Sequence, residues 1–302
     1  AEIEYKDRKS PSIFVKFPLV SDLSKKFPAL KNKKISVIIW TTTPWTLPAN
    51  LAIAFHPDYE YAAFQTDGDV FIAAKRLVPV LAEEMKFKET KVLATLLGKE
   101  LEGLKARHPF INRDSVFVLA DYVTLDQGTG CVHTAPGHGY EDYMTGIAYN
   151  LDIYTPVDSE GKFIPQVERY GGMNVFEANR MITEDMKKDG TLLKEGELVH
   201  SYPHCWRCKN PVIFRATAQW FISMEKNHLR GKVLDEIKKV RWIPPWGEER
   251  IANMVIARPD WCISRQRSWG VPIPAFYCHD CGNILADEKI ALAVADIFSR
   301  DG

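Results

Sequence analysis

Short apolar runs, each closed by a proline, glycine or Asp-Gly signal, restrict the fold of this chain more than any other feature. They lie at residues 35–40, 61–66, 69–74, 91–97, 115–120 and 130–134. Runs of this length between turn signals are typical of β-strands. Pro44 and Pro48 follow the first run and exclude a regular strand or helix interior there. The sequence therefore predicts a β-rich, barrel-like domain that extends to about residue 195.

Helical patterns are fewer and lie between or after these runs. We expect helices over residues 75–86, about 140–150, 175–188 and 224–240. Beyond the β-rich part the sequence becomes rich in tryptophan and predicts a smaller, mixed α/β segment. A chain of 302 residues is long enough for two domains of about 100–200 residues each.

The composition is that of a globular protein, with 46% hydrophobic and 26% charged residues. The formal net charge of zero argues against a surface built to coat a polyanion, although a local basic face can still meet RNA. No apolar stretch reaches the length of about 18 residues that a membrane span needs, and the N-terminus lacks the apolar core of a signal peptide. We therefore expect a cytoplasmic protein. Because the chain begins at Ala1, we also expect an excised fragment.

The stretch GTGCVHTAPGHGYEDY, residues 128–143, concentrates glycines, two histidines and two carboxylates. A phosphate-binding loop is disfavoured, because neither the Walker pattern nor G-x-G-x-x-G occurs. A metal site is disfavoured as well, because His133 and His138 lack a recognisable third ligand nearby. Covalent hydrolysis would need a nucleophile motif such as G-x-S-x-G, which is absent.

A pocket in which water is the nucleophile remains open. Glu141 or Asp142 would hold a cationic group there, and the hydroxyls of Thr41, Thr42 and Thr43 would place water and a carbonyl group. The alternative is that the three threonines only cap and pair the end of a strand. The residues alone do not decide between these interpretations.

Four of the six cysteines form two C-x-x-C pairs, Cys205 with Cys208 and Cys278 with Cys281. In a chain without a secretory signal, such pairs favour metal or redox chemistry over disulfides. Four thiolates together would form a tetrahedral zinc site.

Four motifs, in order along nearly the whole chain, resemble the bacterial isoleucyl-tRNA synthetase family. They are WTTTPWTLPAN (40–50), GTGCVHTAPGHGYEDY (128–143), YPHCWRCKNPVIFRATAQWFISM (202–224) and DWCISRQRSWGVPIPAFYC (260–278). Related valyl and leucyl enzymes typically show Thr-Thr-Arg-Pro where this chain has Thr-Thr-Thr-Pro-Trp-Thr. The isoleucyl assignment rests largely on this departure, and a valyl-type editing domain is the alternative within the group.

The resemblance implies an editing domain of the fold shared by the valyl, isoleucyl and leucyl enzymes, followed by part of the synthetic core. It implies an incoming segment over 1–12, the editing domain over 13–198 and a returning segment over 199–302. The H-I-G-H and K-M-S-K-S motifs of the synthetic site are absent from this sequence. ATP is therefore expected only in the parent synthetic site, and editing is expected to need no cofactor.

Residue roles follow from the same resemblance. Asp142 matches the aspartate that grips the α-ammonium of a misattached amino acid, and His133 matches the residue that shuts out isoleucine. A catalytic role is also implied for Thr42 and Thr43. Substrate-binding roles are implied for Thr41, Trp45, Thr46, Asn50, Gly137, His138 and Gly139.

The implied substrate is the 3′ end of tRNA(Ile) carrying valine, whose ester bond water would attack. The resemblance also allows zinc at Cys278 and Cys281, and at Cys205 and Cys208, in an intact parent whose further cysteines lie outside this span. We expect a monomer with no DNA and no membrane partner. Two competing hypotheses are a zinc-knuckle module that binds RNA or a protein without catalysis, and a freestanding deacylase.

Overall fold

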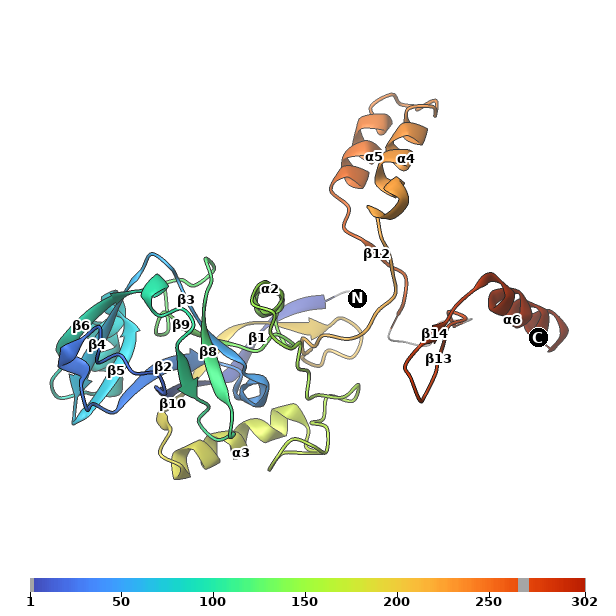
Figure 1. Cartoon of the computed structure of the whole chain (residues 1–302). Coiled ribbons are helices and arrows are strands. Elements are labelled where there is room, and N and C mark those ends of the chain that lie inside the picture. The colour runs from blue at the N-terminus through green and yellow to red at the C-terminus, as the bar shows by residue number, and fades with distance from the viewer. Residues whose placement is uncertain (1–2, 266–271, 302) are drawn as a thin grey trace. The chain divides into compact units, whose positions relative to one another are not determined.

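The computed structural model describes residues 3–265 and 272–301 (Figure 1). By its internal contacts the chain forms two compact units, Ala1–Ala216 and Thr217–Gly302. We describe each unit by itself. The segment boundaries expected after residues 12 and 198 both fall within strands of the larger unit, β1 (Ile3–Pro18) and β10 (Leu192–Cys205), and remain a prediction about the parent protein.

The larger unit contains a six-stranded mixed sheet in the order β10-β1-β2-β5-β4-β6. Besides β1 and β10, its strands are β2 (Ile35–Thr41), β4 (Glu60–Thr66), β5 (Asp69–Ala74) and β6 (Lys91–Leu97). Only β2 and β5 pair in parallel. The apolar runs at 35–40, 61–66, 69–74 and 91–97 thus form strands, as the sequence predicts, and β6 lies at the edge of the sheet.

A four-stranded sheet in the order β7-β8-β3-β9 completes the described β-structure of this unit. Its strands are β7 (Lys105–Arg107), β8 (Asp114–Leu119), β3 (Ala52–Phe55) and β9 (Cys131–Thr134). In the antiparallel pair of β3 and β9, Ile53 lies opposite His133. This register places His133, a candidate functional residue, beside Ile53 of the hydrophobic core.

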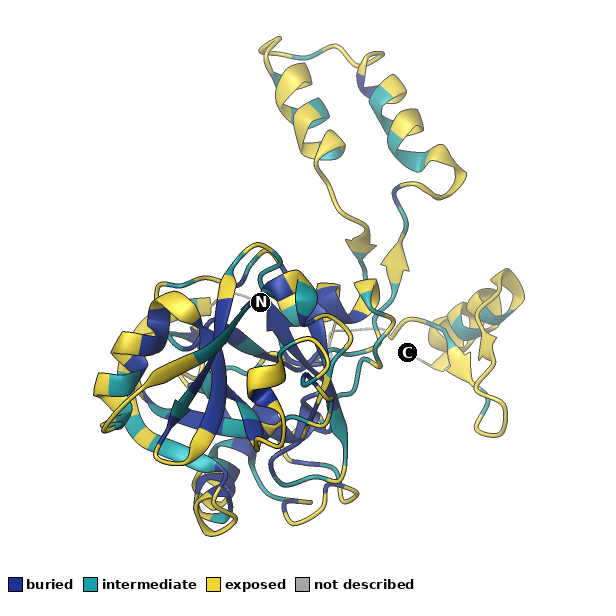
Figure 2. Ribbon diagram, turned by 60° about the vertical axis from the view of Figure 1, so that its left-hand side comes forward, coloured by how far each residue is buried: buried dark blue, intermediate teal, exposed yellow. Residues whose placement is uncertain are grey.

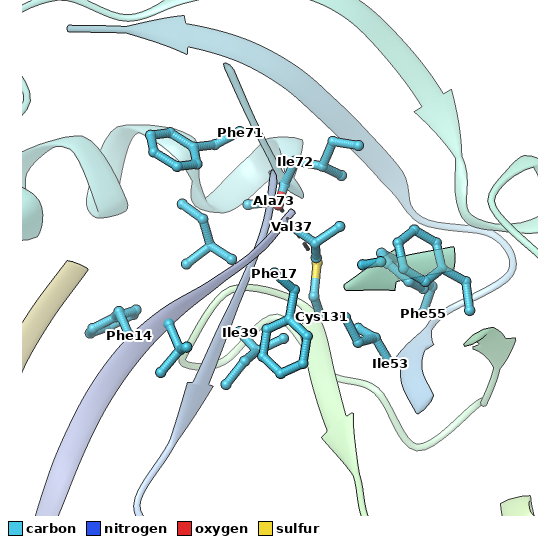
Figure 3. Packing of buried hydrophobic residues seen from close by; sticks show 14 of the residues in the cluster. Phe14, Phe17, Val37, Ile39, Ile53, Phe55, Phe71, Ile72, Ala73 and Cys131 are labelled. Atoms are coloured by element: carbon cyan, nitrogen blue, oxygen red, sulfur yellow. Dashed lines mark hydrogen bonds between the residues drawn. The ribbon is translucent and has the colours of Figure 1, made fainter. Parts of the chain in front are cut away.

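One hydrophobic core joins the two sheets (Figure 3). Phe17, Val37 and Ile39 come from the larger sheet, and Ile53 and Cys131 from the smaller one, and all are at most 2% exposed. The dark blue residues in Figure 2 follow these strands. The expected β-rich architecture is therefore present, in the form of two mixed sheets packed on a shared core.

The expected helices of this unit are confirmed. They are α1 (Val78–Met85), preceded by the 3-10 turn η3 (Lys75–Leu77), α2 (Tyr140–Ala148) and α3 (Val175–Lys188). Three further 3-10 turns are η1 (Pro28–Leu30), η2 (Pro44–Ala49) and η4 (Gly98–Glu100). The Asn174 side chain caps α3 by accepting a hydrogen bond from the Phe176 N–H.

The smaller unit combines short strands with three helices in its described part. Its helical elements are η5 (Lys226–His228), α4 (Leu229–Ile237), α5 (Gly247–Ile256) and α6 (Glu288–Asp301). Its two-residue strands are β11 (Phe221–Ile222), β12 (Trp261–Cys262), β13 (Phe276–Tyr277) and β14 (Ile284–Leu285). Nowhere in residues 3–265 or 272–301 is there a helix long and apolar enough to cross a membrane.

The two cysteine pairs lie in different units. Cys278 and Cys281 occupy the turn between β13 and β14, whereas Cys205 ends β10 and Cys208 follows it. Within the described ranges, no three histidine, cysteine or carboxylate side chains come together as a metal site. These residues therefore do not form a complete zinc site by themselves. Zinc at either pair stays a prediction that requires ligands from elsewhere in the parent protein.

Candidate functional site

A cavity of about 280 Å³ in the larger unit brings the two N-terminal motifs together. It is lined by Thr41, Thr43, Trp45, Thr46, His133, His138, Asp142, Tyr202 and Phe214. The threonines and Trp45 come from the end of β2 and from η2, His133 comes from β9, and Asp142 comes from α2. Residues far apart in the sequence thus form one concave surface, which is the usual form of a small-molecule site.

Two side chains from residues 108–113 donate hydrogen bonds to backbone carbonyls of the proline-rich turn η2. His108 Nε2 donates to the Leu47 carbonyl at 2.8 Å, and Arg113 Nη2 donates to the Pro48 carbonyl at 2.7 Å. Burial lowers the pKa of His108 to about 3, so this histidine is neutral. The two prolines end the strand, and these two donors fix the turn that faces the cavity.

Asn50 lies behind the cavity wall, fully buried, and its amide orientation is fixed. Its Nδ2 donates to the Ala52 carbonyl at 2.8 Å, while its Oδ1 accepts from the Ser115 hydroxyl. The second proton of Nδ2 therefore points to His133 Nδ1, which lies 2.7 Å away. His133 Nδ1 is an acceptor, and its ring carries the proton on Nε2.

The proton on His133 Nε2 extends this chain of hydrogen bonds to Thr46. His133 Nε2 lies 2.9 Å from Thr46 Oγ1, which in turn donates to the Thr43 carbonyl at 2.8 Å. Burial lowers the pKa of His133 to about 3, with further lowering by His138 and Arg113. His133 is thus neutral, and both its nitrogens are occupied. The ring therefore has no free nitrogen that could act as a general base or bind a metal, and it forms a rigid part of the cavity wall.

Asp142 supplies the negative group of the cavity. It lies in the first turn of α2, and its Oδ2 accepts a hydrogen bond from the Ala135 N–H at 2.8 Å. Burial raises the pKa of Asp142 to about 6; the Ala135 N–H opposes this shift and Glu141 adds to it. No lysine or arginine in the described part of the chain forms a salt bridge with Asp142. A partly desolvated carboxylate without a cationic partner is suited to binding an amine.

The loop between β9 and α2 is held by close contacts. A Cβ atom added at Gly137 would lie 2.3 Å from the Tyr154 carbonyl oxygen, so only glycine fits there. His138 Nδ1 donates to the Phe214 carbonyl at 2.9 Å, and its ring meets Trp45 edge-on at 5.0 Å between centroids. Burial lowers the pKa of His138 as well. This loop therefore fixes the position of Asp142 and one side of the cavity.

Most of the residues expected from the sequence meet at this cavity, with informative differences. Thr42 is absent from the lining, and Asn50 supports His133 from behind. Gly137 and Gly139 belong to the loop backbone, and Glu141 is exposed. Thr41 Oγ1 accepts from the Thr43 N–H at 3.0 Å, so its own proton is left to donate elsewhere.

Tyr202 and Phe214 line the cavity but were not expected from the sequence. Both belong to a segment whose motif was assigned to the returning part of the chain. Phe214 follows Val212 and Ile213 in the run NPVIFRATAQ, and this local pattern gives no sign of a contact with the cavity.

Comparisons with known proteins relate this geometry to a family. Residues 1–302 match the family model of class I tRNA synthetases (I, L, M and V). The isoleucine–tRNA ligase of Petrotoga mobilis is 56% identical over 100% of this chain and 32% of its own length. That of Geobacter sulfurreducens is 55% identical over 100% of this chain and 33% of its length. The chain thus spans about a third of the length of the curated relatives it matches.

Among solved structures, the crystal structure of GlLeuRS-CP1 shares the fold. The TM-score is 0.51 at 16% sequence identity, and the match covers 62% of this chain and 99% of that chain.

Proposed function

Because the chain belongs to the class I tRNA synthetases for isoleucine, leucine, methionine and valine, we propose that its larger unit is an editing domain that hydrolyses the ester of mischarged Val-tRNA(Ile). The resemblance to isoleucyl-tRNA synthetases seen in the sequence motifs agrees with relatives that are 55–56% identical over the whole chain. The proposal concerns this unit, and aminoacylation with ATP would belong to the parent protein.

The observation that carries the proposal is the unpaired carboxylate of Asp142 inside the cavity. Asp142 Oδ2 is already held by the Ala135 N–H, which leaves Oδ1 as the available acceptor. An amino acid esterified to tRNA carries an α-ammonium group, and a charge-assisted hydrogen bond to this carboxylate would place its ester carbonyl in the cavity. A zinc-knuckle binding module would not need such a carboxylate.

Rejection of isoleucine is assigned to the neutral wall formed by His133. The two hydrogen bonds from Asn50 and to Thr46 prevent the ring from rotating away from a larger side chain. A single apolar pocket separates isoleucine from valine by only about 1–3 kcal/mol, roughly 10–200-fold, a limit for which isoleucyl-tRNA synthetase is itself the standard example. A second, smaller pocket that admits valine alone would provide the missing discrimination.

Hydrolysis in this cavity would use water directly. Neither serine nor cysteine is among the described lining residues, so a covalent intermediate is not part of the proposal. Water adds to the ester carbonyl, the bond to the ribose oxygen breaks, and that oxygen gains a proton as water loses one. Thr41, whose hydroxyl proton is available, would orient the water or the carbonyl oxygen. Placement and local electrostatics supply the rate in such a mechanism.

The proposal is tested by the loss of ester-linked amino acid from Val-tRNA(Ile) and Ile-tRNA(Ile) in the presence of this chain. We expect faster hydrolysis of the valyl ester, and loss of that activity in Asp142→Ala. Glu141→Ala is the matched control, because its exposed carboxylate is the adjacent residue. Absence of hydrolysis at saturating protein, with bound tRNA demonstrated, would refute catalysis and favour a binding module. Equal rates for both esters, or preference for Thr-tRNA(Val), would refute the isoleucyl assignment.

A further inference from the structure

One lining residue of the cavity differs from the others in its exposure. Thr41, Trp45, Thr46, His133 and His138 are each at most 9% exposed. Phe214 lines the same cavity but is 56% exposed. It therefore marks the edge at which the cavity opens to solvent. Its ring thus offers an aromatic surface to a ligand that enters the cavity from this edge.

The backbone on the N-terminal side of Phe214 is tied to β10. The Val212 N–H donates to the Pro203 carbonyl at 3.1 Å, and the Tyr202 hydroxyl donates to the Val212 carbonyl at 3.1 Å. Tyr202 itself lines the cavity. The segment that leads to Phe214 is therefore anchored to the cavity wall two residues before the ring.

The backbone on the C-terminal side is tied to the loop between β9 and α2, the helix that carries Asp142. His138 Nδ1 donates to the Phe214 carbonyl at 2.9 Å, and the Ala216 N–H donates to the Gly137 carbonyl at 2.7 Å. Phe214 is thus held between two pairs of hydrogen bonds. A residue fixed from both sides loses little additional freedom when a ligand packs against it, which is the advantage of a preorganised binding group.

We propose that Phe214 is a stacking platform for the terminal adenine of the tRNA substrate. The inference rests on the proposed function, since it takes the aminoacyl group to be bound at Asp142. The ribose and base then extend from that carboxylate toward the open edge of the cavity, where the exposed ring lies. Stacking on an aromatic ring is worth about 1–3 kcal/mol per base and tolerates any base, because every base has a flat π-face.

The proposal also separates two tasks within one cavity. Asp142 and the His133 wall select the amino acid, whereas Phe214 binds the end of the nucleic acid that every tRNA shares. Loss of the ring should therefore weaken binding of Val-tRNA(Ile) and leave the rate at saturation and the preference for valine over isoleucine unchanged.

The test is single-turnover hydrolysis of Val-tRNA(Ile) by Phe214→Leu over a range of protein concentrations. We expect the half-saturating concentration to rise by about 5- to 150-fold, the ratio that corresponds to about 1–3 kcal/mol. Phe214→Trp should restore it, because an indole stacks as well as a phenyl ring. Tyr143→Leu is the matched control, since Tyr143 is a 39% exposed aromatic residue of the same unit that does not line the cavity.

A substrate whose terminal nucleotide lacks its base provides the second arm. The wild-type chain should bind it as weakly as Phe214→Leu binds normal tRNA, and Phe214→Leu should lose nothing further. Equal losses by Phe214→Leu on both substrates, or none on normal tRNA, would overturn the proposal.

Binding can also be followed without hydrolysis, through the fluorescence of uncharged tRNA(Ile) with 2-aminopurine at its terminal position. Quenching by the wild-type chain and by Tyr143→Leu, but not by Phe214→Leu, would support stacking even if no ester were hydrolysed. Unquenched fluorescence with saturating wild-type chain would reject the platform while leaving Asp142-dependent hydrolysis intact.

Discussion

The Asp142 carboxylate accepts a hydrogen bond from the backbone N–H of Ala135 at 2.8 Å, across the turn Pro136–Gly139. The contact joins the end of β9 to the first turn of α2, so the carboxylate is positioned by the backbone of its own loop. Its position does not depend on a neighbouring cation. Burial without a countercharge explains why the pKa of Asp142 is raised, although one N–H group already stabilises its ionised form.

The first prediction concerns the pH dependence of hydrolysis. Only ionised Asp142 binds an ammonium group, and its pKa in the free protein is raised to about 6. The ratio of the rate constant to the half-saturating concentration should be greatest near pH 7, below the α-amino pKa of about 7.7, and fall as pH decreases through about 6. Hydrolysis rates from about pH 5 to 8, corrected for spontaneous ester loss, would show this. A level profile across that range would contradict the assignment.

A second prediction links Asp142 to stability. The folded protein holds the Asp142 proton more tightly than the unfolded chain, whose pKa is near 3.8, so stability decreases as pH rises from about 4 to 6 and stays lower above that. At neutral pH the cost is of the order of 2–3 kcal/mol. Asp142→Asn keeps an acceptor for the Ala135 N–H and should raise the free energy of unfolding at pH 7.5, with a smaller gain at pH 5. Urea unfolding at both pH values measures this, and an equal gain at both would argue against a raised pKa.

A third prediction concerns Asn50, which acts from behind the wall. Asn50→Ala removes the donor to His133 Nδ1 and should destabilise the chain by about 1–3 kcal/mol. The freed imidazole can then rotate, so the ratio of Ile-tRNA(Ile) to Val-tRNA(Ile) hydrolysis should rise, as it should for His133→Ala. Ser115→Ala is the control, because it leaves the contact between Asn50 and His133 in place. A wild-type ratio in Asn50→Ala would show that the wall does not need this support.

A fourth prediction tests the close approach at Gly137. Gly137→Ala would place a Cβ atom 2.3 Å from the Tyr154 oxygen and 2.5 Å from Thr155 Oγ1, so we expect a loss of about 1–3 kcal/mol in unfolding free energy and reduced hydrolysis. Gly196→Ala is the matched control, because the nearest atom to its added Cβ is the Ser12 oxygen at an ordinary 3.7 Å. Similar urea midpoints for the two variants would contradict this account.

The inner strands and helices could be predicted from local pattern, whereas the longest strand pair could not. β2, β4 and β5 are short apolar runs whose side chains enter the core, so burial itself produces the signal. β1 and β10 carry charged and exposed side chains along much of their length, with Tyr5 64% and Val199 63% exposed. Their pairing comes from backbone hydrogen bonds between distant segments, which leave no periodic trace in either one.

The residues of the candidate site likewise differ in how far the sequence could predict them. Asp142 and His133 could be predicted from a motif, because both lie within residues 128–143, His133 in β9 and Asp142 at the start of α2. The support that Asn50 gives to His133 could not be predicted, since it depends on the register that brings β3, which directly follows Asn50 and Leu51, beside β9. Phe214 reaches the cavity only through bonds to β10 and to the Gly137–His138 loop, so nothing in its own neighbourhood predicts the contact.

The pairing of Ile3 with Cys205 means that the polypeptide enters and leaves most of the larger unit through adjacent strands. A body whose two connections lie side by side can be inserted into a surface loop of a host protein as readily as a simple hairpin. Such a module can be acquired, exchanged or lost without breaking the host's own hydrophobic core. The extended ladder of β1 and β10 is therefore the place where the two connections of this unit meet.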